Sequence, residues 1–305
     1  MKQYLSLLQN IKETWVETAD RTWVGTKKIF WAQMKYNLAD GFPLVTTKKT
    51  FLRAVFVELI WLIRGETNIK YLVDRNVRIR NERPFQKYID DNNLTADYPR
   101  YSDLRKEKMN RFVEKIKIDD NFAQLRWDLW PVYGYQWRNY GGQWVDQLAT
   151  ALEQIKSNPN SRRIIINARN PAQLEEMLLP PCHMFYQWNV DTTNNILNLQ
   201  MYQRSADMFL WVPFNIASYS LLLILVSKIT WYSPGTFTHT LWDAHIYTNH
   251  IEAVNTQLSR DPYPLPKIEI LKELQSINDL EDLEREDIKL LNYISHPRIK
   301  ASVAV

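Results

Sequence analysis

The chain has 305 residues, of which 45% are hydrophobic and 24% charged, with a formal net charge of +4 at pH 7. That length suits one large globular domain or two small ones, and the mild, dispersed charge disfavours a nucleic-acid coat. A single cysteine excludes an internal disulfide and fits a reducing compartment, and the N-terminus lacks the apolar core of a signal peptide. We therefore expect a cytoplasmic protein with anionic small-molecule ligands.

Hydrophobic periodicity predicts mingled helices and strands, with no repeat or flexible linker. In chain order, we expect a helix at 1–14, a strand at 27–38, a helix at 52–65, a charged surface insertion with a helix or two at 84–125, a helix at 144–159, strands at 162–169, 183–190 and 196–205, a helix at 215–229, a strand at 235–245 and a helix at 244–260. The polar stretch after the strand at 183–190 predicts a hairpin over 183–205. The most apolar run, "SLLLILV", is too short to span a bilayer. The fold class is therefore α/β or α+β.

The only cysteine, Cys182, lies in "LLPPCHMFYQW". A reactive thiol needs a lowered pKa, usually from nearby cations or a helix N-terminus. If the strands on either side pair, Arg204 lies beside Cys182. The alternative is a packed core thiol, the commoner fate of a lone cysteine. His183 points to the opposite face of a strand, so neither a Cys-His pair nor a zinc site is expected.

Four arginines stand at the edges of predicted strands or turns, each beside Ser, Thr or Asp. These are Arg21, Arg162, Arg163 and Arg204. A guanidinium group can donate two parallel hydrogen bonds to the oxygens of one phosphate, and Ser205 adds a hydroxyl donor. A phosphate site is therefore one interpretation. The other interpretation is a set of unrelated surface arginines.

Three more side chains are candidates for the site. Glu58 stands alone in an apolar helix face, where a carboxylate shuttles protons or forms a structural ion pair. His245 and Tyr247 are two apart just after a strand, so in extended geometry both face one ligand. A satisfied core histidine is the more common outcome for His245.

Taken together, the motifs resemble the thymidylate synthase family over nearly the whole chain. They are "DGFPLVTTKK", "ELIWLIRGETNIKYL", "PVYGYQWR", "SRRIIINARNP", "LPPCH", "QRSAD", "VPFNIASY", "DAHIYTNH" and "IKASVAV". The resemblance implies a single catalytic domain, 1–305, built on a large twisted mixed β-sheet covered by helices, with an insertion like that of longer bacterial members. It implies an obligate sheet-to-sheet homodimer and reductive methylation of dUMP to dTMP by 5,10-methylenetetrahydrofolate, without a metal.

The resemblance also implies a role for each matching residue. Cys182 attacks carbon 6 of uracil, with Arg204 helping to keep it a thiolate, while Glu58 and Tyr133 manage protons. The nucleotide is held by Arg21, Arg204, Ser205, Asn215, His245 and Tyr247, joined by Arg162 and Arg163 of the partner subunit. Folate is held by Asp207, Ile79, Leu210, Trp211, Phe214 and Val303, and the C-terminal tail closes over the site.

Departures from the family pattern are oddly uniform. Tryptophan replaces the usual glycine at Trp15, Trp23, Trp31, Trp127, Trp130, Trp211, Trp231 and Trp242. The chain has only 7 glycines, where average usage predicts roughly 21. We therefore hypothesise that these codons are UGA, read as tryptophan but meaning glycine in the source. On this view only a chain with Trp211 changed to glycine, or the glycine-restored chain with all eight changed back, turns over well.

Arg80, Arg83 and Arg169 stand where the family usually has tryptophan, and the first two positions normally help form the folate pocket. A divergent member with a rebuilt pocket could admit water and become a dUMP hydroxymethylase. A third alternative is a catalytically impaired homologue that only binds the nucleotide. Retention of Cys182, Glu58 and Tyr133 argues against it, because binding alone needs no nucleophile.

Overall fold

The computed structural model describes residues 1–14, 16–18, 24–126 and 129–302. The chain divides into two compact units. The first comprises Met1–Phe56, Gln147–Asn167 and Cys182–Val305, and the second comprises Val57–Asp146 and Ala168–Pro181. A single catalytic domain over 1–305 stays a prediction.

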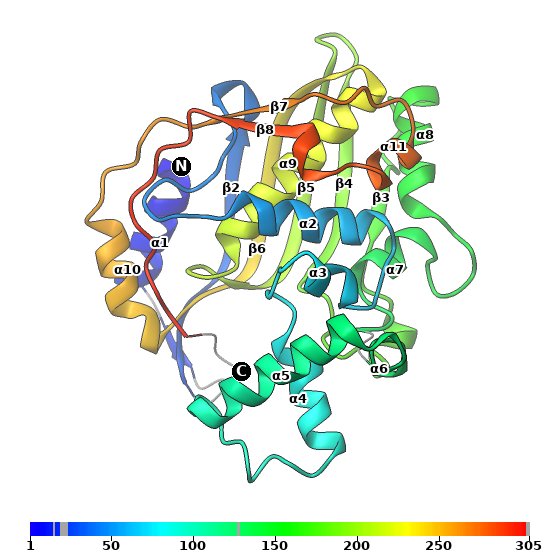
Figure 1. Ribbon diagram of the computed structural model, residues 1–305. Coiled ribbons are helices and arrows are strands. Elements are labelled where there is room, and N and C mark those ends of the chain that lie inside the picture. Colours follow the sequence, from blue (N-terminus) through cyan, green and yellow to red (C-terminus); the bar gives the residue numbers. More distant parts are fainter. Residues whose placement is uncertain (15, 19–23, 127–128, 303–305) are drawn as a thin grey trace. The chain divides into compact units, whose positions relative to one another are not determined.

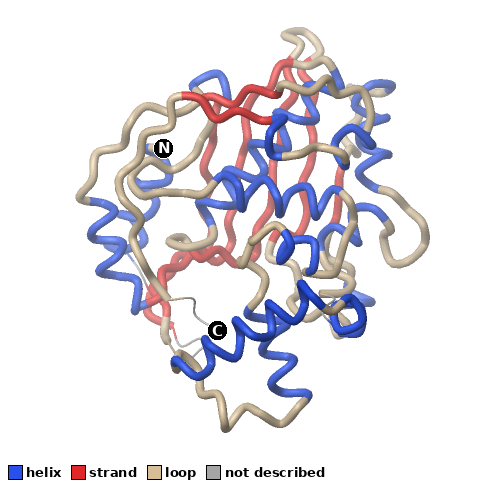
Figure 2. Tube along the Cα trace, in the orientation of Figure 1, coloured by secondary structure: helices blue, strands red, loops and turns tan. Residues whose placement is uncertain are grey.

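One mixed sheet organises the described part of the first unit (Figure 1, Figure 2). Its six strands run in the order β1 (Val16–Thr18), β2 (Thr26–Asn37), β6 (Ser233–Tyr247), β5 (Ile196–Asp207), β4 (His183–Asp191) and β3 (Ile165–Asn167). Only β5 and β6 are parallel, and the other pairs are antiparallel. The expected mixed sheet and the hairpin over 183–205 are both confirmed.

Helix α9 (Val212–Thr230) forms the core against this sheet. Its Tyr219 stacks on Phe237 of β6 with ring centroids 6.0 Å apart, and meets Tyr186 of β4 edge to face. The run "SLLLILV" is thus part of a 19-residue helix that is long and apolar enough to cross a membrane by length and composition. However, 83% of that span is buried in the protein, as in the core helix of a globular fold.

The other helices of the first unit are α1 (Lys2–Thr14), α8 (Gln147–Ser157), α10 (Ile251–Leu258) and α11 (Ile277–Glu281), and β7 (Lys267–Ile270) pairs with β8 (Ile288–Leu291). The helix expected at 244–260 is wrong at its start. Strand β6 continues to Tyr247, which pairs with Thr26, and α10 begins only at Ile251. Sheet pairing therefore overrides the helical periodicity of "AHIYTNH".

Helices make up most of the second unit. They are α2 (Leu52–Ile63), which begins in the first unit, then α3 (Lys70–Asp74), α4 (Glu82–Asp91), α5 (Asp103–Ile118), α6 (Asp120–Arg126) and α7 (Tyr133–Arg138). The segment 84–125 is more helical than the helix or two expected, because α4, α5 and α6 all fall within or overlap it. Aromatic rings hold these helices together, with Phe112 5.4 Å from Phe85 and 6.0 Å from Phe122.

Candidate active site

Cys182 immediately precedes β4 and is partly exposed. His183 pairs with Gln203 across the hairpin, and the backbone N–H of Arg204 donates to the Cys182 carbonyl at 2.9 Å. The sequence predicted that strand pairing would place Arg204 beside Cys182, and the observed register does so. Cys182 therefore stands across the hairpin from a residue whose side chain is permanently charged.

The other predicted phosphate ligands occupy separate places. Ser205 follows Arg204 on β5, and both are partly exposed. Arg162 and Arg163 are exposed where the chain approaches β3, a strand at the edge of the sheet. Arg21 lies outside the described residues. The first unit thus brings Arg204 and Ser205 together near Cys182 and presents Arg162 and Arg163 at the sheet edge.

Asn215, on α9, belongs to a buried chain of hydrogen bonds. The Gln203 Nε2 donates to Asn215 Oδ1 at 3.2 Å and to the Ser205 carbonyl at 2.8 Å. The Gln203 Oε1 faces His239 Nε2 at 2.8 Å. Burial, together with the nearby His183, lowers the pKa of His239 well below its usual value, so the imidazole is neutral. Its Nε2 must carry the proton, because Oε1 only accepts. The chain therefore leaves the Asn215 Nδ2 amino group for a ligand.

His245 and Tyr247 lie together on β6, as predicted, with ring centroids 5.2 Å apart. The His245 Nδ1 is 2.8 Å from Asp243 Oδ1, and Lys28 Nζ is 2.8 Å from Asp243 Oδ2. Burial alone would raise the pKa of Asp243, but its bonds to His245 and Lys28 lower it below the usual value. A carboxylate accepts, so Nδ1 carries the proton and Nε2 is left as an acceptor, suited to a hydroxyl group.

The segment after β5 carries Asp207, Phe209 and Leu210. The Asp207 Oδ1 accepts from the backbone N–H groups of Phe209 and Leu210, each at 3.0 Å, which leaves Oδ2 as an acceptor for a ligand. Lys48 is buried, donates to the Phe209 carbonyl and stands 3.6 Å over the Phe209 ring. Burial lowers the pKa of Lys48 to about 7, although the negative charge of Asp207 acts to raise it. The partly exposed Leu210, and Phe214 on α9, add apolar surface beside Asp207.

Glu58, Tyr133 and Ile79 belong to the second unit. The Glu58 Oε1 is 2.5 Å from Arg80 Nε, in an ion pair whose side chains are 12% and 20% exposed. The Arg80 guanidinium also lies 5.3 Å from the Tyr133 ring centroid. A structural ion pair was one of the two roles predicted for Glu58, and this ion pair is present. The partner of Glu58 is Arg80, a position where the family usually has tryptophan. Ile79 is half-buried beside Arg80.

Comparison with known proteins decides the family. The family described as thymidylate synthase matches residues 2–305. The thymidylate synthases of Mycoplasma mobile, Mesoplasma florum and Malacoplasma penetrans are 50%, 47% and 45% identical over 305 residues, covering 100% of both chains. The chain belongs to the thymidylate synthase family. Members of this family are methyltransferases that convert dUMP to dTMP with methylenetetrahydrofolate as co-substrate.

Two of the tryptophans that replace a family glycine have backbone angles that favour glycine. Trp31, in the middle of β2, has a φ of 71°, and Trp231, which caps the C-terminus of α9, has a φ of 58°. Trp144 also has a φ of 58° and is 88% exposed, a third such position that the sequence did not single out. Their rings are mostly exposed, so the cost of these tryptophans is conformational.

The remaining tryptophans of this set differ in setting. Trp211 precedes α9 with a φ of −96°, which any residue adopts, and its ring lies 6.3 Å from that of Phe214. At this position the backbone of this chain does not require glycine, so the effect of the tryptophan comes from its side chain. Trp15, Trp23 and Trp127, like Val303, lie outside the described residues.

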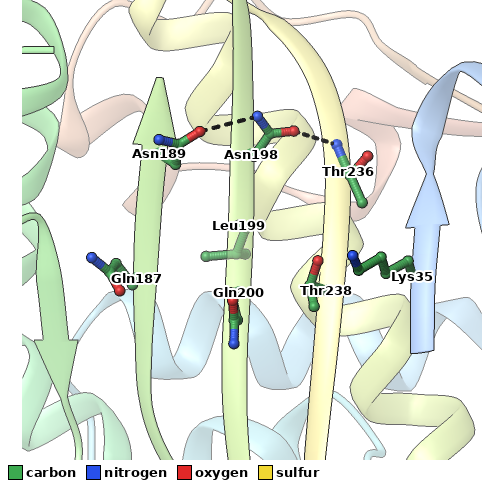
Figure 3. Close-up of a pocket in the computed structure, with 8 residues that line it drawn as sticks. All are labelled: Lys35, Gln187, Asn189, Asn198, Leu199, Gln200, Thr236 and Thr238. Atoms are coloured by element: carbon green, nitrogen blue, oxygen red, sulfur yellow. Dashed lines mark hydrogen bonds between the residues drawn. The ribbon is translucent and has the colours of Figure 1, made fainter. Parts of the chain in front are cut away.

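A hollow on the exposed face of the sheet lies away from these residues. Its polar lining comes from four neighbouring strands (Figure 3) and includes Lys35, Gln187, Asn189, Asn198, Gln200 and Thr238. None of the eight residues that line it is a predicted site residue.

Sequence reasoning missed several residues that hold the predicted site residues in place. Gln203 and His239 orient Asn215, Asp243 and Lys28 orient His245, and Lys48 holds the segment after Asp207. The adjacency of Asp243 to His245 in "DAHIY" was a signal for one of these, because residues two apart on a strand share a face. The others depend on pairs farther apart along the chain, from 12 positions for Gln203 and Asn215 to 215 positions for Lys28 and Asp243.

Proposed function

We propose that the chain performs this methylation through a covalent bond between Cys182 Sγ and carbon 6 of the uracil of dUMP. The observation that carries the proposal is the pairing of Arg204 with Cys182 in a chain that matches the family from end to end. Addition of the thiolate to carbon 6 makes carbon 5 nucleophilic. Carbon 5 then bonds to the methylene group and loses its proton, and the bond between the methylene group and the folate nitrogen breaks. The tetrahydrofolate transfers a hydride to the exocyclic methylene carbon, and Cys182 leaves as dTMP and dihydrofolate form.

The first unit supplies the groups that hold dUMP. Arg204 and Ser205, with Arg21, hold the phosphate. The Asn215 Nδ2 donates to oxygen 4 of uracil, and the second lone pair of Oδ1 accepts from the base N–H. The His245 Nε2 accepts from the ribose hydroxyl, assisted by Tyr247. Because cytosine carries an amino group in place of oxygen 4, this polarity excludes it.

The fixed orientation of Asn215 leads to a prediction for Gln203. In Gln203→Glu both side-chain oxygens accept, so the Asn215 amide should rotate and present its oxygen to the base. We expect the ratio of dissociation constants for dCMP and dUMP to fall by about 100-fold, since a site built for one hydrogen-bond pattern rejects the other strongly. Equilibrium binding of both nucleotides measures it.

Gln203→Met is the matched control, similar in length but without hydrogen bonds. It should weaken binding of dUMP without producing a preference for dCMP. Equal weakening of both nucleotides by Gln203→Glu, with the ratio unchanged, would show that Gln203 does not set the polarity of Asn215. A melting temperature close to that of Gln203→Met checks that the charged variant is folded.

The segment Asp207–Phe214 fits the folate co-substrate. Asp207 Oδ2 accepts from the pterin, and Leu210, Trp211, Phe214 and Ile79 provide apolar surface, with Val303 in the tail that closes the site. When bound, the folate supplies the one-carbon unit and the hydride. Glu58 and Tyr133 move protons at the base, and a Glu58 carboxylate bound to Arg80 is less available for that task than one bonded through water.

We also propose a cytoplasmic homodimer in which the two sheets pack face to face. The exposed face of the sheet carries the stacked pair Phe185 and Tyr202, with ring centroids 4.6 Å apart, and Trp242, whose ring meets Tyr202 edge to face at 6.2 Å. A polar and aromatic face of this kind suits a second copy of the chain. Arg162 and Arg163, exposed near the sheet edge, would then reach the partner's phosphate site.

Shared sites predict complementation between two inactive variants. In the glycine-restored chain, Cys182→Ala removes the nucleophile and Arg163→Ala removes a phosphate ligand from the opposite site. After unfolding and refolding as a mixture, half of the dimers are mixed and each has one intact site, so activity should return to about a quarter of the parent. If the mixture has no more activity than its components, the sites are not shared. Refolding each variant alone is the control.

The reaction itself is tested by incubating the chain with dUMP and methylenetetrahydrofolate and separating the products. We expect dTMP and dihydrofolate in equal amounts. Hydroxymethyl-dUMP with tetrahydrofolate would establish the hydroxymethylase instead. Nucleotide binding with neither product would establish a binding protein. The assay is run on the chain as written and on the glycine-restored chain, which we expect to be much more active.

A further inference from the structure

His250 is a buried histidine to which no step of the proposed reaction gives a role. It precedes α10, is fully buried, and its Nε2 lies 2.7 Å from the carbonyl oxygen of Ser302. A carbonyl oxygen only accepts, so Nε2 carries the proton. The His250 Nδ1 is buried and has no hydrogen-bond partner among the described residues. This histidine is therefore oriented toward the C-terminal tail by a single polar contact.

The same imidazole touches both predicted substrate subsites. Its ring centroid is 5.4 Å from that of Phe209, in the segment that carries Asp207, and 5.6 Å from that of Tyr247, the predicted ribose ligand. Phe209 is held from other directions by Lys48 and by Asp207 Oδ1. His250 thus contacts one residue of the predicted nucleotide subsite, one residue of the segment predicted to bind folate, and the C-terminal tail.

The C-terminal strap, residues 293–302, is fastened at several earlier points. Tyr293 Oη donates to the Val45 carbonyl at 2.8 Å, the His296 N–H to the Thr46 carbonyl at 2.8 Å, and Arg260 to the Pro297 carbonyl at 2.8 Å. Among the described residues, the bond from His250 to Ser302 is the fastening nearest the C-terminus. The strap therefore has a fixed point at Ser302.

We propose that His250 is a positioning residue that fastens the closing tail at Ser302 and aligns it with Phe209 and Tyr247. The hydrogen bond fixes where the last residues begin, and the ring contacts fix that point relative to both subsites. The proposal rests on the proposed function only in so far as the tail covers the folate. The fastening of Ser302 itself is independent of the reaction.

Amide hydrogen exchange of residues 299–302 in the full chain tests the fastening. In His250→Asn the amide is too short to reach Ser302, so exchange should accelerate by about tenfold, as for the loss of one buried hydrogen bond. In His250→Gln the longer amide reaches as far as Nε2 and exchange should stay within about twofold of the parent. His296→Asn is the matched control, because its Nε2 also meets a carbonyl, that of Asp261 at 2.9 Å, but in an exposed part of the strap. Unchanged exchange in His250→Asn, or equal exchange in the Asn and Gln variants, overturns the proposal.

Kinetics in the glycine-restored chain test the coupling to the site. We expect His250→Asn to raise KM for methylenetetrahydrofolate about tenfold with a smaller change in KM for dUMP, and His250→Gln to restore it. In a chain that ends at Ala301, the Asn and Gln variants should be equal, because the acceptor is gone. A further loss caused by His250→Asn in that shortened chain would mean a merely structural role and overturn the coupling. If shortening leaves turnover intact, the proposed closing role of the tail fails, while the exchange result still decides the fastening.

Discussion

Replacement of Cys182 by alanine should lower kcat for dTMP formation by about 10⁴-fold or more, because no other group can form the bond to carbon 6. The dissociation constant for dUMP should change by less than about threefold, since the nucleotide is held chiefly through its phosphate, ribose and base edge. Single-turnover kinetics and equilibrium binding in the glycine-restored chain measure the two effects. Activity within tenfold of the parent would exclude Cys182 as the nucleophile.

A covalent intermediate gives a second check on Cys182. Acid quenching of the parent during turnover, followed by digestion and mass spectrometry, should show the nucleotide attached to the peptide that contains residues 178–188. Cys182→Ala should show no adduct under the same conditions. An adduct on another peptide would move the nucleophile elsewhere, whatever the rate of the alanine variant.

Replacement of Trp31 and Trp231 together by glycine should raise the free energy of unfolding by about 2–4 kcal/mol, since left-handed backbone costs a non-glycine residue about 1–2 kcal/mol. Little burial is lost, because these side chains are 64% and 71% exposed. Lys156 lies 5.0 Å from the Trp231 ring centroid, and losing that contact offsets about 0.5–1 kcal/mol. Urea unfolding of the parent and the double variant measures the difference.

Trp211→Gly is the control that separates backbone strain from the effect on the pocket. Its φ of −96° suits tryptophan, so glycine should lower stability by about 0.5–1 kcal/mol through added freedom of the unfolded chain. Turnover should nevertheless rise, because the indole beside Phe214 no longer occupies the expected folate surface. A loss of stability in the Trp31 and Trp231 double variant would contradict the assignment of these positions to glycine.

The nucleotide sequence offers an independent test of the same idea. The eight codons are expected to be UGA, whereas those of Trp61 and Trp137, fully buried tryptophans at ordinary family positions, are expected to be UGG. Trp144 should join the first group, because its φ of 58° and its exposure match those of Trp31 and Trp231. UGG at all of these positions would refute the hypothesis.

Much of the sheet could be predicted because its pattern is local. Alternating side chains and the turn at "DTTNN" define the β4–β5 hairpin. A β-bulge between His183 and Phe185 then shifts the register by one residue, and only this shift, which has no signal in the sequence, puts Arg204 opposite Cys182. The end of β6 could not be predicted in this way. Residues 244–247 repeat with a helical period, and their strand state comes from pairing with Thr26 and Lys27, more than 200 residues earlier.

Parts of the site were hidden for a similar reason. A histidine inside a strand gives the same signal whether it fills the core or orients a ligand, so His239 could be recognised only once Gln203 and Asn215 were placed beside it. The partner of Glu58 was likewise open, because an ion pair between residues 58 and 80 depends on how the intervening helices turn back. Left-handed backbone at Trp31 has no sequence signal except the family glycine that it replaces.

In the hydrogen bonds from His239 through Gln203 to Asn215, each residue donates to the next. This order of donors and acceptors bears on how the preference for a base could change in evolution. If Asn215 reads the base as proposed, the choice of nucleobase depends on which nitrogen of the buried His239 imidazole carries the proton, two residues removed from the ligand. The shape of the pocket could stay constant while its preference reversed, if that proton moved from one nitrogen to the other. A library that varies only residues touching the nucleotide would never sample this route to a new base.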